Sequence, residues 1–220
     1  ELQAIRSFQG LQGSRLVVVG GKKLLTKLPL VYQMLGQIDT LCLAGGLANT
    51  LLHSFGYNLG TSWVEYGQLN AVKELSQRAK ELHVNLLYPE DVMVSEDATG
   101  QGAVYEVAID QIKPHEQIID IGSKTKNTFI AAIKQAHSVY WNGPLGRYEC
   151  THGMDGTSSI GHNIAKHAEY SLVGGGDTLA CLLQLQMTGF SHISAGGGAF
   201  LYFFAHNTSA VLEAMEQEYV

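Results

Sequence analysis

The sequence predicts an α/β fold in which helices cover both faces of a mainly parallel sheet of about six strands. Short aliphatic runs end in glycine and are followed by segments with helical periodicity, and this pattern recurs along the chain. The runs are apolar at consecutive positions rather than alternating, as expected for strands that are covered on both faces. Strands alternating with helices favour parallel pairing and right-handed crossovers, which together give a doubly wound, Rossmann-like three-layer sandwich.

The expected strands are the aliphatic runs that stop at glycine. With their glycines they occupy residues 16–21, 41–46, 118–122, 138–143, 171–176 and 192–198, and a further run at 84–87 is another strand. We expect one helix from Gln68 to Glu81, because its apolar residues share one face: Leu69, Val72, Leu75 and Ala79. The stretch from Gly100 to Ile112 alternates more loosely and predicts a small antiparallel ribbon.

Length and composition favour a single domain over residues 1–220, since 45% hydrophobic content is enough for one sizeable core. The net charge of -6 and the 15% of charged residues provide no basic field for nucleic acid or a membrane surface. No apolar run approaches the roughly 20 residues of a membrane span. Cys42, Cys150 and Cys181 show no disulfide or zinc pattern, so we expect a cytoplasmic, monomeric protein. Because the chain starts with Glu1 rather than Met, we also expect it to be part of a longer protein.

Glycine-ended parallel strands point to a phosphate site. The turns after such strands lie at one edge of the sheet, where helix N-termini present backbone N–H groups and glycine allows an anion close to the backbone. A single glycine cluster is explained by a tight turn, but six at one edge favour polyphosphate binding. The sequence has no P-loop motif, and no convincing Gly-x-Gly-x-x-Gly follows a strand, which disfavours P-loop enzymes and ordinary dinucleotide dehydrogenases.

Two of these clusters carry charged residues. Lys22, Lys23 and Lys27 follow the first glycine pair, where cations oppose the helix dipole unless an anion is bound; the alternative is that they are ordinary exposed lysines. Asp177 and Thr178 follow the triple glycine at 174–176. Asp177 is either an N-cap or a ligand of Mg²⁺, which proteins usually bind through one or two carboxylates together with substrate phosphates.

Six blocks of the sequence, in order and spacing, resemble the C-terminal domain of the phosphoglycerate kinase family, in a form similar to its bacterial branch. The blocks are residues 20–27, 44–50, 120–123, 141–146, 174–178 and 194–200, among which the Trp-Asn-Gly-Pro block and the paired triple glycines are specific to that family. The resemblance implies a two-domain enzyme that uses Mg²⁺ to move a phosphoryl group between 1,3-bisphosphoglycerate and ADP, forming 3-phosphoglycerate and ATP. It implies that this chain holds the nucleotide, and that an N-terminal domain, absent here, holds the phosphoglycerate.

The resemblance also implies roles for individual residues. Lys23 and the helix starts after Gly176 and Gly198 would stabilise the transferring phosphoryl group, and Asp177 would bind the metal. Glu149 would accept hydrogen bonds from the ribose hydroxyls. The remaining nucleotide contacts would come from Lys27, Gly45, Gly46, Gly122, Asn142, Gly143, Pro144, Tyr148, Gly175 and Thr178.

Several positions depart from the family pattern, and they leave other functions open. The departures are Lys22, Leu25, Ala44, Ser123, Arg147, Tyr148, Ala195 and Tyr202. They motivate a second hypothesis, a nucleotide-binding or regulatory module without catalysis, and a Rossmann-type dehydrogenase is a third. The histidines form no set of three or four metal ligands with the cysteines. We interpret Trp63 and Trp141 as packing residues.

Overall fold

The computed structural model describes residues 2–97, 99, 102–150 and 152–194. Six parallel strands form the main sheet in the order β3-β2-β1-β7-β8-β9. Their bounds are β1 (Arg15–Val19), β2 (Thr40–Leu43), β3 (Asn85–Leu87), β7 (Ser138–Asn142), β8 (Tyr170–Gly174) and β9 (His192–Ser194). This is the strand order of doubly wound sheets that bind dinucleotides. The expected fold class is confirmed.

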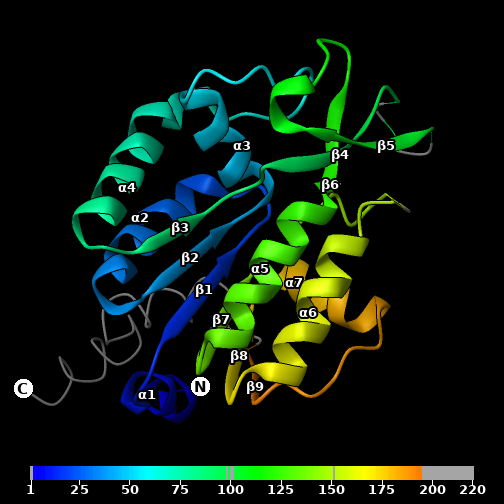
Figure 1. The fold of residues 1–220 in the computed structure, drawn as a ribbon. Helices are drawn as coiled ribbons and strands as arrows, with labels where there is room; N and C mark the ends of the chain where they lie inside the picture. Colours follow the sequence, from blue (N-terminus) through cyan, green and yellow to red (C-terminus); the bar gives the residue numbers. More distant parts are fainter. Residues whose placement is uncertain (1, 98, 100–101, 151, 195–220) are drawn as a thin grey trace, which may run out of the picture.

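Helices cover both faces of this sheet (Figure 1). On one face lie α1 (Leu2–Gly10), α2 (Leu24–Met34), α3 (Gly45–Ser54) and α4 (Leu69–Glu81), and on the other α5 (Ser123–Gln135), α6 (Asp155–His167) and α7 (Gly176–Gln184). Short 3₁₀ turns occupy Leu35–Gln37, Tyr66–Gln68 and Ile109–Gln111. The helix predicted from Gln68 begins at Leu69, and the Val72, Leu75 and Ala79 side chains are buried as its periodicity requires.

Two apolar cores sandwich the strands because alternate strand residues point to opposite faces. In β1, Val17 and Val19 belong to the core under α2 and α3, whereas Leu16 and Val18 belong to the core under α5 and α6. All four side chains are at most 1% exposed, which explains why the run is apolar at every position.

A second, antiparallel sheet interrupts the alternation between β3 and β7. It consists of β4 (Asp91–Ser95), β5 (Val104–Ala108) and β6 (Gln117–Ile121), in the order β5-β4-β6. The ribbon expected at Gly100–Ile112 is therefore present as β5. The run at 118–121 was wrongly expected in the main sheet: as β6 it pairs with β4, and the strand at Asn85–Leu87 takes the sixth place instead.

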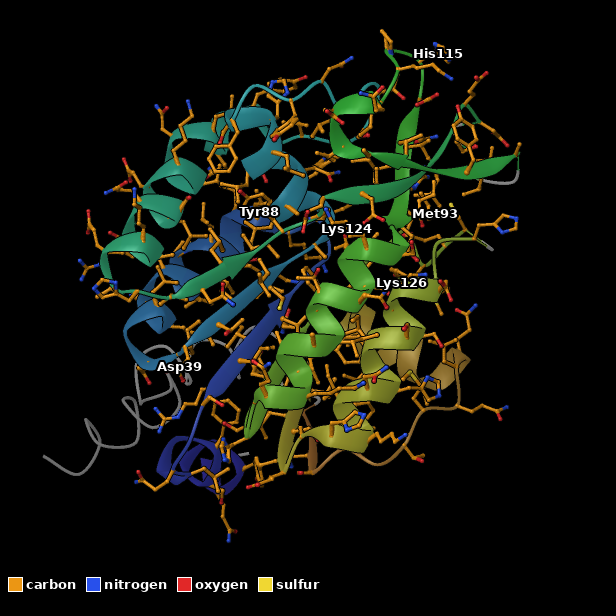
Figure 2. The ribbon with its side chains drawn as sticks, viewed as in Figure 1. Asp39, Tyr88, Met93, His115, Lys124 and Lys126 are labelled. Carbon is orange, nitrogen blue, oxygen red and sulfur yellow. The ribbon has the colours of Figure 1, made fainter. Side chains whose placement is uncertain are left out.

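Helix α5 begins where the small sheet ends, and a residue of that sheet caps it. The Asp91 carboxylate accepts hydrogen bonds from Lys124 N (2.8 Å) and Thr125 N (2.7 Å), satisfying N–H groups that no helical carbonyl can reach. Lys124 and Lys126 project from this first turn (Figure 2), and Lys126 forms an ion pair with Asp155 at the start of α6. The small sheet is thereby linked to α5, and α5 to α6.

Candidate functional site

A pocket of 400 Å³ opens at the carboxyl edge of the main sheet. The chain leaves β1 toward one face and β7 toward the other, so the two turns diverge there, and ligands of open α/β sheets bind at such a point. Backbone hydrogen bonds hold the turns together, from Gly20 N to Asn142 O (2.9 Å) and from Gly21 N to Pro144 O (2.8 Å). The volume lies within the usual range of small-molecule sites.

The close approach of these two turns requires glycine. A Cβ on Gly20 would overlap the carbonyl oxygen of Pro144, and one on Gly143 would overlap the carbonyl of Gly20. Gly143 also has φ +100°, which side chains other than glycine rarely adopt. Neither Gly20 nor Gly143 lines the pocket, but the two turns that they bring together supply Gly21 and Pro144 to its lining.

One end of the pocket is charged. Lys23, the N-cap residue of α2, places Nζ 3.9 Å from Oδ2 of Asp177 in the first turn of α7, and both residues line the pocket with Lys22. The side chains of Lys23 and Asp177 are 73% and 38% exposed, so this ion pair contributes little to stability. At this position Lys23 could contact a bound polyanion, and Asp177 could contact a cation that accompanies it.

Lys27 is bonded to the backbone near the charged end of the pocket. Its Nζ donates hydrogen bonds to Gly20 O (2.7 Å) and Asn142 O (3.4 Å), joining the ends of β1 and β7. Burial lowers the pKa of Lys27 to about 8; Asp177 opposes this shift, and Lys23 adds to it. Burial thus disfavours the charged ammonium group, although two backbone carbonyls accept hydrogen bonds from it. Lys27 does not line the pocket.

Tyr148 and Glu149 line the pocket beside Asp177. Burial raises the pKa of Tyr148, and the carboxylates of Asp177 and Glu149 raise it further. The same two carboxylates act on Cys181, whose pKa burial raises to about 11. Two carboxylates, Asp177 and Glu149, therefore act on this part of the pocket, and a carboxylate at the position of Asp177 suits Mg²⁺ held jointly with a phosphate.

Another acidic group in the described part of the chain is less suited to a metal. Glu96, His115 and Glu116 place possible ligand atoms within 4.8 Å of one another at the outer end of the small sheet, where His115 is labelled in Figure 2. The Glu116 carboxylate, however, already accepts hydrogen bonds from Tyr105 and from Lys113 N (2.9 Å), and it is paired with Lys113 Nζ (3.1 Å).

Three predicted residues build the walls without facing the pocket. The Thr178 hydroxyl accepts from Gly143 N (2.7 Å) and donates to Gly174 O (2.8 Å), so it ties the turn after β7 to the end of β8. Asn142 is buried and donates to the Tyr140 hydroxyl (3.0 Å). Gly175 is the N-cap of α7 with φ 99°, and Asp177 is therefore not the cap.

Gly122, predicted as a nucleotide contact, lies at the start of α5. It is the N-cap of α5, and a Cβ there would overlap the Asp91 carboxylate that caps this helix. It does not line the pocket, and neither does Gly176, while Gly198 and Ala195 lie outside the described residues. The predicted residues that do line the pocket are Lys23, Gly45, Gly46, Pro144, Tyr148, Glu149 and Asp177.

A buried carboxyl group lies behind the wall formed by Ile119 and Gly146. Asp120 is 1% exposed, and its Oδ2 accepts a hydrogen bond from Gly156 N (2.7 Å) near the start of α6. Burial raises the pKa of Asp120 to about 7, although the N–H groups of Gly156 and Ile121 oppose this shift. Sequence reasoning gave this residue no role.

The part of the pocket remote from Lys23 was not predicted. It is formed by β6 through Ile118 and Ile119, and by the segment after α3 through Thr61 and Trp63. Trp63 was wrongly interpreted as a packing residue, since it is 40% exposed, whereas Trp141 is buried as expected. No local signal marks these residues, because they reach the pocket only through the small sheet and its contacts.

The family model for phosphoglycerate kinase matches residues 1–207. The chain belongs to the phosphoglycerate kinase family. It is 35% identical to the phosphoglycerate kinase of Coxiella burnetii over 219 residues, covering 99% of this chain and 56% of that protein. It is 32% identical to the phosphoglycerate kinase of Francisella philomiragia over 202 residues, covering 91% of this chain and 52% of that protein.

Solved structures of phosphoglycerate kinases share this fold. The structure from Coxiella burnetii has a TM-score of 0.89 at 36% identity, covering 93% of this chain and 54% of that one. The structure from Pyrococcus horikoshii has a TM-score of 0.83 at 28% identity, covering 99% of this chain and 56% of that one. The chain thus spans about half the length of the phosphoglycerate kinases it matches.

Three departures from the phosphoglycerate kinase pattern line the pocket, namely Lys22, Arg147 and the Tyr148 described above. Lys22 lines it beside Lys23 and adds positive charge there. Arg147 lines it beyond Tyr148, and its Nη1 donates a hydrogen bond to Gln117 Oε1 (2.6 Å) at the start of β6. Arg147 therefore connects the turn after β7 to the small sheet.

Proposed function

We propose that the chain is the nucleotide-binding, C-terminal domain of a phosphoglycerate kinase. In this proposal it binds MgADP or MgATP while phosphoryl is transferred between 1,3-bisphosphoglycerate and ADP, giving 3-phosphoglycerate and ATP. The observation that supports it best is the pocket at the carboxyl edge, with Lys23 and Asp177 at one end and apolar residues of β6 at the other. A nucleotide has the same polarity, with charged phosphates at one end and a flat base at the other.

The charged end supplies what phosphoryl transfer requires, which is mostly positioning and charge neutralisation. Lys23 would lie against the transferring phosphoryl group, and N–H groups at the start of α7 would donate to phosphate oxygens. Asp177 would hold Mg²⁺, which when bound neutralises phosphate charge. Both reacting groups, a carboxylate and a phosphate, are already ionised at pH 7, so no side chain needs to act as a general base.

The acceptor half of the reaction would belong to a second domain. Among the described residues, the cations that line the pocket are Lys22, Lys23 and Arg147, and two of them lie beside the proposed phosphate position. We propose that the phosphoglycerate binds to the other half of the protein. We also propose that this chain, as a single domain, has no kinase activity alone. We further propose that the protein is monomeric. We also propose that it is cytoplasmic, because Cys42, Cys150 and Cys181 are all buried as free thiols. In the described part of the chain, no helix is long and apolar enough to cross a membrane.

Calorimetric titration of this chain with MgADP tests the proposal directly. We expect saturable binding, and about tenfold weaker binding after Lys23→Ala, because a charge-assisted contact to phosphate is lost. Lys73→Ala on the exposed surface of α4 is the matched control and should bind as the wild type does.

Two results would contradict the proposal. An absence of binding at millimolar MgADP would remove its basis, and binding of NADH in preference to MgADP would favour a dehydrogenase. In the longer protein with its phosphoglycerate-binding half, Lys23→Ala should abolish turnover. A longer protein that binds MgADP but never turns over would instead favour the non-catalytic module.

A further inference from the structure

Trp63 is a large aromatic side chain that the packing of the protein does not bury. It is 40% exposed and lines the pocket together with Gly46 and Asn49. Its six-membered ring lies against the first turn of α3, where a Cβ on Gly46 would overlap it. Trp141 differs in both respects, because it is fully buried and its Nε1 donates to Gly143 O (2.8 Å).

Hydrogen bonds to α3 hold the backbone around Trp63. The Asn49 side chain donates to the carbonyl of Trp63 (3.2 Å), and Glu65 N donates to the buried hydroxyl of Thr50 (3.2 Å). Asn49 and Thr50 are adjacent on α3, and their partners flank the indole on its C-terminal side. The position of Trp63 relative to the charged end of the pocket is therefore fixed by the helix.

The preceding residues fasten the same segment to the small sheet. Thr61 N donates to Glu116 O (2.7 Å), and the Ser62 hydroxyl accepts from Ile118 N (2.8 Å). The backbone on both sides of Trp63 is consequently held before any ligand arrives. A segment whose backbone is already ordered loses little conformational entropy on binding.

Aliphatic side chains line the pocket with Trp63, and Asn49, Thr61 and Gln117 add polar groups. Ile118 and Ile119 from β6 and Leu145 after β7 line the same cavity, whereas Lys22, Lys23 and Asp177 line its charged end. A flat heterocycle in this region would exchange water contacts for contact with an aromatic face and with aliphatic side chains. Nucleobases stack on aromatic side chains in this way, and the interaction tolerates different bases because every base has a π-face.

We propose that Trp63 stacks on the base of the bound nucleotide and sets the preference of the pocket for purines over pyrimidines. The inference rests on the proposed nucleotide site and adds to it the residue that contacts the base. Stacking grows with the overlapping ring area, so a two-ring base gains more than a one-ring base. The phosphates, which lie near Lys23, gain nothing from the indole.

The experiment compares ligands with and without a base. The chain is titrated calorimetrically with MgADP, MgCDP and magnesium tripolyphosphate, using the wild type, Trp63→Ala and Trp63→Phe. Trp63→Ala should weaken MgADP binding about tenfold, while Trp63→Phe stays within about threefold. Tripolyphosphate should bind equally to all three proteins, and the preference for MgADP over MgCDP should shrink in Trp63→Ala.

Fluorescence provides a second measurement, because Trp63 and Trp141 are the two tryptophans of the chain. Saturation with MgADP should change the emission of the wild type, and this change should disappear in Trp63→Phe, in which only the buried Trp141 remains. This readout does not depend on whether Trp63→Ala folds.

The possible failures are distinguishable. If Trp63→Ala binds MgADP as the wild type does, or loses MgADP and tripolyphosphate equally, the stacking inference is wrong while the nucleotide site stands. If the wild type binds tripolyphosphate but not MgADP, or binds neither, the proposed nucleotide site fails and the stacking inference fails with it.

Discussion

Replacing Lys27 with methionine would measure the electrostatic cost of the ammonium group that joins β1 to β7. Burial lowers the pKa of this lysine from 10.5 to about 8. At 1.36 kcal/mol per pKa unit, the folded protein disfavours the charged form by about 3 kcal/mol. Methionine removes that cost, but it leaves Gly20 O without the Lys27 donor, a loss of about 1–3 kcal/mol. At pH 7 the unfolding free energy of Lys27→Met should therefore lie within about 2 kcal/mol of the wild-type value.

The pH dependence separates these two contributions. Between pH 8 and pH 10.5 the folded lysine has lost its proton and the unfolded one has kept it. The unfolded state then binds more protons, so the stability of the wild type rises with pH. From pH 7 to pH 10 the wild type should gain about 2.5 kcal/mol relative to Lys27→Met, whose side chain does not titrate.

Urea unfolding followed by circular dichroism at pH 7, 8, 9 and 10 would measure this difference. Lys73→Met on the exposed surface of α4 controls for the general loss of one positive charge. If the stability curves of the wild type and Lys27→Met run parallel from pH 7 to pH 10, the lysine is not desolvated and the reasoning fails. The same samples test the nucleotide contact that the resemblance implies for Lys27. About tenfold weaker MgADP binding in the variant would support that contact, and unchanged binding would agree with the position of Lys27 outside the pocket lining.

Three further variants test single contacts. Asp120→Asn should remove a pH dependence of stability whose sign is opposite to that of Lys27. The pKa of Asp120 is raised from 3.8 to about 7, so the wild type should lose stability as pH rises through this window. Urea midpoints that shift in parallel for the two proteins would contradict this. Thr178→Val should lower the unfolding free energy by about 1–3 kcal/mol, because Gly143 N and Gly174 O lose their shared hydroxyl, whereas the exposed Thr188→Val should have no effect in the same chemical unfolding measurement. Gly122→Ala should lower the unfolding free energy by about 1–3 kcal/mol, because the added methyl group crowds the Asp91 carboxylate, and it should leave MgADP affinity unchanged. Weaker MgADP binding without a loss of stability would instead indicate that Gly122 contacts the nucleotide.

The layers of the main sheet could be predicted because the local sequence of each strand indicates that it is a buried strand. Consecutive apolar residues such as Leu16 and Val17 require cover on both faces, and the glycines that follow mark the carboxyl edge. The partner of a strand is not recorded locally. The run at 118–121 has the same apolar, glycine-ended pattern as β1, yet it pairs with Asp91–Ser95 in the small sheet.

The charged end of the pocket was predicted for a similar reason, and the other end was not. Lys23 and Asp177 stand directly beside glycine-ended strands, so their place at the sheet edge follows from the chain order. Trp63 is held at the pocket by a hydrogen bond from Asn49 to its own carbonyl and by one from Ile118 N to the neighbouring Ser62 hydroxyl, and these bonds connect separate parts of the chain. Thr178 shows the converse, because a hydroxyl beside the triple glycine turned inward to the backbone of Gly143 and Gly174.

The pairing of β1 with β7 has a consequence for synthesis on the ribosome. It matches Arg15 with Ser138, and residues of these two strands are 123 positions apart in the sequence. β1 can pair with β2 as soon as residue 43 has emerged, but its other edge waits for residue 142. At about 5–20 residues per second, the centre of the final sheet stays an open strand edge for roughly 5–20 s. Charged side chains often protect exposed strand edges, but the buried residues of β1 cannot be charged because both faces of the strand are covered in the folded protein. Protection of the nascent edge therefore has to come from outside the strand.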